Sequence, residues 1–402
     1  MSPPPSSSRS RQAPSSRSRT SSRLASLSRT ATLAALVLLA AAPAPAEAAY
    51  SLTKAYQGSD FFDGWSFYGT YDNLTNGDVD YVSASNRKDL AYINGAGNAI
   101  VKVDNTTAVI YPNKRRSVRI ETKETYPIGS LWVYDMLHLP YGCSVWPSAW
   151  SSAPNWPQGG EIDTFEGVNQ QQVNRMALHT ADGCSVSNST TSAAYTGELE
   201  FGNCYVYSSA NSGCGITERN ENSYGESFAT NGGGVWVTEL AKDGVRIWFF
   251  PRASVPDDIS NSSAVPDPSS WPSPSAFYPS SSCEISNFFA PQHLVLTITL
   301  CGDWAGNTNV LNQTGCALTT DMCYTSYVLT SSNYDNAYFE IPSIRVYHNP
   351  DLAANSSAAA LVGFPSNIAV AGQKNPTSGA RRSGIAAAFG AAVLAVGAWT
   401  LM

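Results

Sequence analysis

The chain has few of the histidine, cysteine and glycine-rich motifs that bind metals and nucleotides in enzymes. It has only four histidines in 402 residues, and they are scattered without the spacing of metal ligands. None of its eight cysteines forms a Cys-x-x-Cys pair, which argues against a zinc ribbon. It also has no glycine-rich phosphate loop before a helix, no Gly-x-Ser-x-Gly turn and no His-Glu-x-x-His pair. We therefore expect an activity that uses no metal and no cofactor.

Amphipathic helices and positive charge are also scarce. No internal segment convincingly repeats its apolar residues with the 3.6-residue period of a surface helix. Between residues 49 and 375 there are 16 Lys and Arg against 30 Asp and Glu, a net charge of −14 (16 minus 30). Such a surface repels nucleic acid and anionic membranes and suits a secreted hydrolase acting on a neutral polymer. We expect a monomer with no nucleic-acid partner.

The first 48 residues are typical of a secretory signal peptide. Residues 1–30 carry six Arg and no acid, residues 31–40 are apolar, and Ala46-Glu47-Ala48 offers a cleavage site. The Arg and Ser content also fits a mitochondrial transit peptide. Secretion is favoured because the cysteines are even in number, allowing up to four disulfides of undetermined pairing, and because sequons are frequent. The expected N-glycosylation sites are Asn73, Asn105, Asn188, Asn261, Asn312 and Asn355.

The C-terminal segment predicts a lipid anchor. Residues 351–375 form a linker rich in Ser, Ala and Asn, and residues 376–402 end in an apolar tail that starts at Ile385. This pattern is typical of a GPI-attachment propeptide, with Asn375 preferred over Gly372, Ser378 and Gly379 as the attachment residue. A tail-anchored or single-span protein is the alternative, but the tail is short and Ala-rich for a stable span. We expect passage through the secretory pathway and a GPI anchor at the cell surface, in the plasma membrane or wall, as the only membrane contact.

Residues 49–350 remain as one domain, long enough for a single large core. Its periodic segments have period two, which predicts strands at 117–122, 131–137, 235–240, 245–250, 293–300, 338–342 and 343–347. Ala241-Lys242-Asp243-Gly244 joins two of these segments as a hairpin turn. Residues 203–234, with two cysteines, are expected to be a disulfide-pinned loop. Residues 255–282, rich in Pro and Ser, are expected to be a loop on the surface or at the cleft rim. The pattern predicts an all-β fold, a β-sandwich or jelly roll.

The segment 160–167, Gly-Glu-Ile-Asp-Thr-Phe-Glu-Gly, carries the strongest functional signal. Its three carboxylates, Glu161, Asp163 and Glu166, alternate with apolar or β-branched residues, which indicates a strand. Residues i and i+2 of a strand share a face, so Glu161 and Asp163 point the same way. Glu166 would point the opposite way unless a β-bulge restores the parity. We place that bulge at Thr164-Phe165.

With the bulge, the two glutamates lie near each other on one face. Carboxyl groups roughly 5–5.5 Å apart serve a retaining glycosidase as nucleophile and acid/base. Asp163, between them, is placed to hydrogen-bond the nucleophile and keep it ionised. The alternatives for this segment are a calcium site and an acidic strand edge.

Several of the ten tryptophans lie in polar surroundings. Those framed by Gly, Pro or Asp are expected at a cleft rim, where an indole face stacks on a sugar ring. They are Trp146, Trp156 and Trp304. Trp132 and Trp248 lie in apolar runs and are expected in the core, whereas Trp150 fits either place.

Two further residues are candidates for the site. His179 reaches the carboxylates if its strand pairs with the acidic strand; otherwise it is an ordinary half-buried histidine. Arg119 alternates with Val118 and Ile120, so it projects either into a cleft or into water.

Together these motifs resemble glycoside hydrolase family 16, and within it the fungal laminarinase-type endo-β-glucanases. The resemblance rests on the acidic motif and on others in order along residues 55–348. These are Trp-Pro-Ser-Ala-Trp (146–150), Leu-His-Thr (178–180), Asn-Gly-Gly-Gly (231–234), Trp-Phe-Phe-Pro-Arg (248–252), Cys-Gly-Asp-Trp-Ala-Gly (301–306) and Ile-Arg-Val-Tyr (344–347). One departure is Thr164-Phe165, where relatives often have two aliphatic residues.

The resemblance implies a curved, concanavalin A-like jelly roll with an open cleft. It implies Glu161 as nucleophile, Glu166 as acid/base and Asp163 as an assisting residue. The leading hypothesis is a retaining endo-hydrolase of β-glucans with β-1,3 or mixed β-1,3-1,4 linkages. The alternatives are a cell-wall β-glucan transglycosylase on the same fold and a non-catalytic β-glucan-binding surface protein. The intact acid trio argues against the last.

Overall fold

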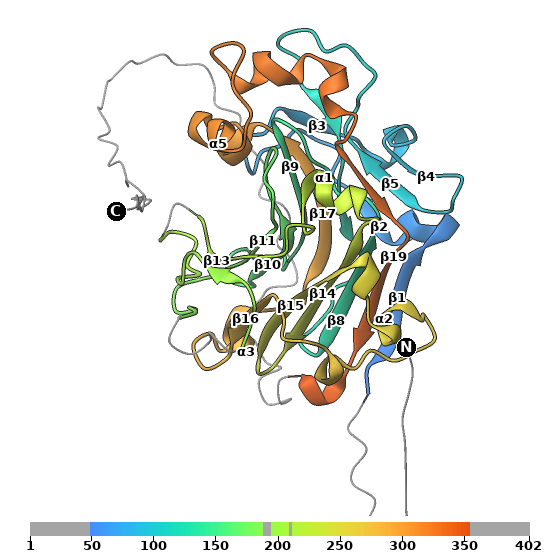
Figure 1. The fold of residues 1–402 in the computed structure, drawn as a ribbon, viewed down its shortest axis with the longest axis vertical. Helices are drawn as coiled ribbons and strands as arrows, with labels where there is room; N and C mark the ends of the chain where they lie inside the picture. Colours follow the sequence, from blue (N-terminus) through green and yellow to red (C-terminus); the bar gives the residue numbers. More distant parts are fainter. Residues whose placement is uncertain (1–48, 188–193, 209–210, 354–402) are drawn as a thin grey trace, which may run out of the picture. The chain divides into compact units, whose positions relative to one another are not determined.

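The computed structural model describes residues 49–187, 194–208 and 211–353, which belong to one compact unit. The predicted signal peptide, most of the linker and the anchor segment lie outside these residues, as do Asn188, Asn355 and Asn375. Two antiparallel sheets form the body of the unit (Figure 1). Within the described residues, no helix is both long and apolar enough to cross a membrane.

The first sheet has six strands and includes the predicted hairpin. In spatial order its strands are β1 (Ser51–Gln57), β19 (Ser343–His348), β8 (Ser130–Met136), β14 (Gly234–Ala241), β15 (Gly244–Pro251) and β16 (Ala276–Pro279). The hairpin joins β14 to β15, with Ala241 paired to Gly244. Gly244 has φ +155°, and a Cβ there would meet the backbone oxygen of Tyr278 at 2.7 Å, so the turn requires glycine.

The second sheet has eight strands and carries the acidic segment near its middle. In spatial order its strands are β12 (Glu198–Leu199), β13 (Cys214–Thr217), β11 (Arg175–His179), β10 (Glu161–Glu166), β9 (Val145–Ser152), β17 (His293–Leu300), β7 (Arg119–Thr122) and β2 (Trp65–Phe67). Neighbours far apart in sequence, such as β9 and β17, make this sheet dependent on long-range pairing.

Smaller elements complete the fold. A three-stranded sheet contains β18 (Tyr338–Ile341), β5 (Ala99–Lys102) and β4 (Ala91–Ile93), and a parallel pair contains β3 (Val79–Tyr81) and β6 (Arg115–Ser117). The α-helices are α1 (Gly225–Thr230), α2 (Asp257–Ser260), α3 (Ile285–Phe288), α4 (Gly302–Ala305) and α5 (Thr308–Gln313). The 3₁₀ helices are η1 (Gly58–Gly64), η2 (Ala84–Asn86), η4 (Arg252–Ser254), η5 (Pro268–Ser270), η7 (Ser331–Tyr334) and η8 (Pro350–Leu352); η6 (Tyr324–Val328) is a π-helical turn.

The core fills the space between the two sheets. Phe165 of β10 and Trp236 of β14 meet there, with ring centroids 6.4 Å apart. Trp132 is fully buried in the same core, as the sequence predicts. Trp248 is also buried, but it lies on the opposite face of the six-stranded sheet, in a second cluster with Ile259. The six-stranded sheet is therefore apolar on both faces.

That second cluster corrects the expectation that residues 255–282 form only a surface loop. The segment contains α2, η5 and the edge strand β16, which pairs with β15. Trp271 packs edge-on against Trp248 at 5.3 Å and covers the outer face of the sheet. The density of Pro and Ser hid this role, because one tryptophan and one isoleucine supply most of the apolar contact.

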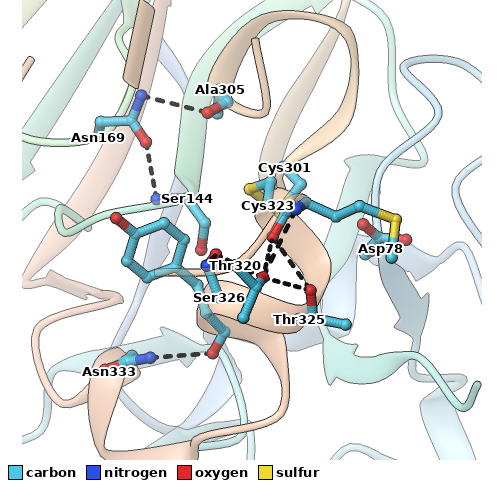
Figure 2. Close-up of a disulfide and its surroundings, with 12 residues drawn as sticks. Asp78, Ser144, Asn169, Cys301, Ala305, Thr320, Cys323, Thr325, Ser326 and Asn333 are labelled. Carbon is cyan, nitrogen blue, oxygen red and sulfur yellow. Dashed lines mark hydrogen bonds between the residues drawn. A yellow bond between two sulfur atoms is a disulfide. The ribbon is translucent and has the colours of Figure 1, made fainter. Parts of the chain in front are cut away.

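All eight cysteines pair, which confirms the expectation of up to four disulfides. The bonds are Cys143–Cys316, Cys184–Cys283, Cys204–Cys214 and Cys301–Cys323. Figure 2 shows the last of these beside Asn169, whose side chain accepts from the Ser144 N–H at 2.7 Å. Cys301 follows β17 directly, so this bond fixes the chain just before α4. The predicted loop 203–234 is pinned by Cys204–Cys214 but also contains β13 and α1.

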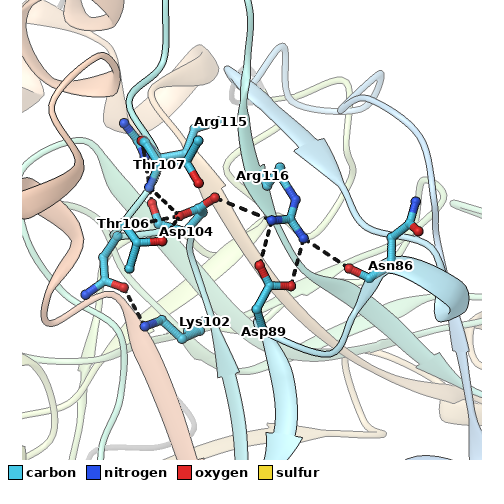
Figure 3. A network of polar contacts seen from close by, with 9 residues as sticks. Asn86, Asp89, Lys102, Asp104, Thr106, Thr107, Arg115 and Arg116 are labelled. Atoms are coloured by element: carbon cyan, nitrogen blue, oxygen red, sulfur yellow. Dashed lines mark hydrogen bonds and ion pairs between the residues drawn. The ribbon is translucent and has the colours of Figure 1, made fainter.

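A polar network that is buried at Arg115 and Asp104 and exposed at Asp89 anchors β6 (Figure 3). The guanidinium of Arg115 is fully buried and donates to the backbone oxygens of Val328 and Asp104, at 2.8 and 2.7 Å. Arg116 holds Asp89 through two bonds of 2.7 and 2.9 Å. Burial disfavours the charged form of Asp104, but hydrogen bonds from Thr106 and Thr107 outweigh it and lower the Asp104 pKa to about 2.

Candidate active site

The acidic strand β10 contains the bulge that the sequence predicts. Against β11 the register is regular as far as the pair Asp163–Ala177, and it shifts before Glu166 pairs with Arg175. Against β9 the shift falls between Asp163 and Phe165. The extra residue restores the parity, because Phe165 is fully buried in the core while Glu166 remains half-buried. All three acids therefore share one face of the sheet.

Each glutamate receives an indole N–H. Trp156 Nε1 donates to Oε2 of Glu161, and Trp146 Nε1 donates to Oε1 of Glu166 at 3.0 Å. Trp146 also packs edge-on against Trp304 of α4, with ring centroids 5.5 Å apart. Of the three tryptophans predicted as sugar platforms, Trp146 and Trp156 contact the carboxylates and Trp304 packs against Trp146. Two of them have a contact that the sequence did not suggest, a hydrogen bond to an acid.

Asp163 and His179 form the deepest part of the site. Asp163 is 1 % exposed, and its carboxyl group lies within 4.8 Å of that of Glu161. His179 lies directly opposite Glu161 on β11, with Nε2 at 3.2 Å from Oδ2 of Asp163. The condition that the sequence set for His179, pairing of its strand with the acidic strand, is met. Its Nδ1 faces Oδ1 of Asn211, also at 3.2 Å.

Burial strongly perturbs two of the acids. It raises the pKa of Glu161 to about 8, with the charge of Asp163 as the next cause. Burial, and then the charge of Glu166, raises the pKa of Asp163 well above its usual range. When Asp163 holds a proton, its charge repulsion of Glu161 disappears. Protonation of Asp163 therefore favours an ionised Glu161.

Cross-strand pairs place Arg119 on the same face as the acids. Glu166 is opposite Ser148 on β9, Ser148 is opposite Thr297 on β17, and Thr297 is opposite Arg119 on β7. Three strand spacings of about 4.8 Å separate Glu166 from Arg119, roughly 14 Å in all. Arg119 therefore belongs to the floor of this face but not to the acid trio.

The surroundings of Arg119 form a shallow pocket of about 170 Å³. It is lined by Ser66, Phe67, Tyr68, Arg119 and Glu121. The guanidinium lies between the rings of Tyr68 and Trp150, at 4.7 and 5.1 Å from their centroids. Among the described residues, its Nε–H has no hydrogen-bond acceptor.

The contact with Arg119 places Trp150 at the site face rather than in the core, a choice that the sequence left open. The ring is half-buried on the site face, and its Nε1 donates to Thr297 at 3.1 Å. Sequence reasoning missed Tyr68 entirely, because its aromatic ring has no distinctive local context.

Sequence reasoning also missed Arg175, whose charge faces the acids. Arg175 is buried opposite Glu166, and it donates to Glu200 at 2.9 Å and to the backbone oxygen of Ser212 at 2.6 Å. A Cβ at Gly215 would meet the guanidinium at 2.2 Å, so a glycine is needed where Arg175 crosses β13. The only local signal was an arginine at the start of a strand, and the register that brings it to Glu166 cannot be read from the sequence.

The same atoms raise the question of a metal ion. Ligand atoms of Glu161, Asp163 and His179 lie within 4.8 Å of one another. Calcium requires six to eight oxygen ligands, and one member of this group offers nitrogen. One Glu161 oxygen already accepts an indole N–H, a contact that favours an anion rather than a bound cation. The arrangement fits proton transfer between carboxyl groups better than calcium binding.

Four predicted glycosylation sites lie in the described residues. The side chains of Asn73, Asn261 and Asn312 are exposed. The Asn105 amide donates to Asp335 at 2.7 Å and is half-buried.

A β-sandwich whose sheet face presents two glutamates, each bonded by an indole, defines a glycoside hydrolase of the jelly-roll class. The chain belongs to glycoside hydrolase family 16, because residues 65–347 match the family described as the XgeA-like, catalytic GH16 domain. It is 37% identical over 294 residues to a probable glycosidase of Schizosaccharomyces pombe, covering 72% of this chain and 67% of that protein. It is 35% identical to endo-1,3(4)-beta-glucanase xgeA of Emericella nidulans, covering 72% of this chain and 47% of that enzyme. The chain thus spans less than half of that relative.

Two solved structures share the fold over their full lengths. Laminarinase 16A from Phanerochaete chrysosporium, solved with β-glucans in both donor and acceptor sites, is 37% identical with a TM-score of 0.70. The match covers 75% of this chain and 100% of that one. An elongating family 16 β-1,3-glucosyltransferase is 34% identical with a TM-score of 0.68, covering 74% and 99%. These similarities agree with the predicted all-β jelly roll.

Proposed function

We propose that the chain is a retaining endo-hydrolase of β-glucans with β-1,3 or mixed β-1,3-1,4 linkages. The observation that carries the proposal is the bulge in β10, which brings Glu161 and Glu166 to one face. A sheet without the bulge would bury one of the two acids. The endo-1,3(4)-beta-glucanase of Emericella nidulans supports the assignment of substrate class.

In the proposed reaction Glu161 is the nucleophile and Glu166 the acid/base. Glu166 protonates the glycosidic oxygen as the Glu161 carboxylate attacks the anomeric carbon, which leaves a covalent glycosyl-enzyme. Glu166, now ionised, then removes a proton from water, which attacks the anomeric carbon and releases Glu161. A protonated Asp163 assists by hydrogen-bonding the nucleophile.

The surrounding residues provide the sugar contacts. Trp156 is 41 % exposed, so one ring face is available for stacking while its N–H holds Glu161. Trp146 and Trp304 occupy the side of Glu166. Arg119, which lines the pocket beside Tyr68 and lies against Trp150, is placed to contact a sugar unit farther along the cleft.

Replacing each glutamate with glutamine tests the assignment. We expect Glu166→Gln to lower kcat on laminarin by about 10²–10⁴-fold, the usual contribution of a general acid/base. Glu161→Gln is expected to lose at least as much, because no covalent intermediate forms. Initial rates of reducing-sugar release measure both variants.

Glu239→Gln is the matched control, since Glu239 is 5 % exposed and lies on β14 of the other sheet. Its carboxylate is bonded to Tyr50 at 2.8 Å and to Arg246 at 3.0 Å, so the change should lower stability but not kcat. Near-normal turnover by Glu161→Gln or Glu166→Gln would refute the assignment. Parallel assays on laminarin, lichenan and carboxymethylcellulose would rank the linkages.

A β-glucan transglycosylase is the second candidate, favoured by the similarity to the elongating β-1,3-glucosyltransferase. The same glycosyl-enzyme would serve both reactions, because either water or a sugar hydroxyl can attack it. Adding an acceptor oligosaccharide and analysing product length separates them. Longer products indicate transfer, and shorter products alone indicate hydrolysis.

We further propose that the enzyme passes through the secretory pathway, is N-glycosylated and is held at the cell surface by a GPI anchor. The eight paired cysteines fit an oxidising compartment. Release of the protein from cells by a phosphatidylinositol-specific phospholipase would support the anchor, and retention in membranes after that treatment would oppose it.

A further inference from the structure

The bulge in β10 interrupts the hydrogen-bond ladder at the point where the site is built. The register between β10 and β11 shifts between Asp163 and Glu166. A bulge leaves backbone groups of the extra residues without their normal partners on the next strand. Thr164 is fully buried, so a backbone group left unpaired there would destabilise the fold.

The side chain of Asn174 takes the place of the missing ladder bonds. Its Oδ1 accepts from the Glu166 N–H at 2.9 Å, and its Nδ2 donates to the Thr164 carbonyl at 3.0 Å. One amide thus bridges both ends of the bulge. An amide is suited to this role because it offers one acceptor and one donor side by side.

Asn174 is itself held rigidly in the fold. It is fully buried, its N–H donates to Oγ of Ser223 at 3.0 Å, and its carbonyl accepts from the Glu218 N–H at 2.9 Å. The next residue, Arg175, begins β11. Asn174 therefore connects a fixed strand start to the irregular part of β10.

We propose that Asn174 is a positioning residue that fixes the bulge and thereby aims the Glu166 carboxyl group. This inference rests on the proposed role of Glu166 as acid/base. The Glu166 backbone N–H is one of the two groups that Asn174 holds, so its loss moves the Cα from which the carboxyl group projects. Displacement of a catalytic group by about 1 Å can lower a rate about 10²-fold.

The test compares Asn174→Ala with Glu166→Ala on two substrates. Laminarin has a poor leaving group that needs protonation by Glu166. In a 2,4-dinitrophenyl β-laminaribioside the 2,4-dinitrophenolate group leaves without protonation. Azide can then attack the glycosyl-enzyme without a general base. Each protein is assayed on laminarin, and on the aryl glycoside with and without azide.

If Asn174 positions Glu166, Asn174→Ala loses about 10²-fold in kcat on laminarin with a KM changed less than threefold. On the aryl glycoside with azide it recovers most of the wild-type rate, and glycosyl azide accumulates. Equal losses on both substrates would mean a general structural role and would overturn the proposal. Absence of azide rescue in Glu166→Ala would show that the assignment of Glu166 is wrong. That outcome differs from a failure of the Asn174 proposal, in which Glu166→Ala is rescued by azide and Asn174→Ala is not.

Two further variants keep the test informative if Asn174→Ala folds poorly. Asn174→Asp keeps the acceptor for the Glu166 N–H but loses the donor to Thr164, so we expect the same substrate dependence with a smaller defect. Asn94→Ala is the control, because the Asn94 side chain accepts from the backbone of Ala96 and Asn98 in the β4–β5 turn, at 2.9 and 3.0 Å. It should lower stability without changing the rate ratio of the two substrates. An Asn174→Asp enzyme with wild-type kcat on laminarin would also contradict the proposal.

Discussion

At the scale of single residues, the site depends on neutral N–H donors bound to carboxylates. An indole N–H favours the charged form of the acid that it contacts without adding a competing cation. Trp156 serves Glu161 in this way, and Trp146 serves Glu166. Each of these tryptophans thus combines an aromatic ring with an acid-binding N–H, and phenylalanine would keep only the ring.

Trp146→Phe separates the two properties, because it keeps an aromatic ring and removes the N–H. In the proposed reaction Glu166 becomes a carboxylate as it gives up its proton, and the indole N–H would stabilise that charge. A hydrogen bond to a charged group contributes about 1.5–3 kcal/mol, so we expect kcat on laminarin to fall by about 10- to 100-fold. Steady-state kinetics should show the loss in kcat with little change in KM.

Trp248→Phe is the matched control for that prediction. The Trp248 N–H donates to the Pro272 carbonyl at 3.0 Å, the same length as the bond in the site, but on the far face of the six-stranded sheet. Its loss should lower stability and leave kcat unchanged. An unchanged kcat in Trp146→Phe would show that the ring alone matters there.

At the scale of strands, period-two patterns were sufficient where one face of a strand meets the core. They predicted the β14–β15 hairpin and the parity of β10, since the bulge is the one way to bring Glu166 to the face of Glu161. They could not predict Asn174 or Arg175, which act only through the register between strands. That register is set by long-range contacts, and a polar residue before a strand looks like any turn residue.

Another contact of the bulge ties the two sheets together. The hydroxyls of Thr164 and Thr238 are 2.6 Å apart, and both side chains are fully buried. Either single change to valine leaves the other buried hydroxyl without a partner, which lowers the free energy of unfolding by about 1–3 kcal/mol. The double variant Thr164→Val/Thr238→Val removes both and should lie within about 1 kcal/mol of wild type.

Guanidinium unfolding of the oxidised protein measures this cycle. Additive losses in the double variant would show that the hydroxyl pair is not the coupling between β10 and β14. The same variants assayed on laminarin show whether the sheet-to-sheet tie also affects the acids.

At the scale of the whole molecule, opposing groups of acids set the pH dependence of stability. Asp104, with its pKa lowered to about 2, stabilises the fold above its ordinary pKa of 3.8, and that contribution is lost as the pH falls toward 2. Glu161 and Asp163 act in the other direction, because their pKa values are raised. Stability is therefore expected to be greatest in mildly acidic solution.

Glu161 makes the alkaline side of this profile testable. Its pKa is about 8 in the folded protein against 4.5 for the free side chain, so between these pH values the unfolded chain releases a proton that the folded chain keeps. The contribution of Glu161 to the free energy of unfolding is fully present below pH 4.5 and is lost as the pH rises to 8. At about 1.4 kcal/mol per unit, the total is on the order of a few kcal/mol.

Glu161→Gln removes this contribution, because glutamine is neutral at every pH. At pH 4.5 most of Glu161 is protonated in the folded protein, so the two proteins should have similar stability there. As the pH rises to 8 the wild type should lose stability faster, and the variant should become the more stable of the two. A slope remains in the variant, because Asp163 also has a raised pKa. Parallel stability curves across this range would show that Glu161 is ionised in the folded protein throughout.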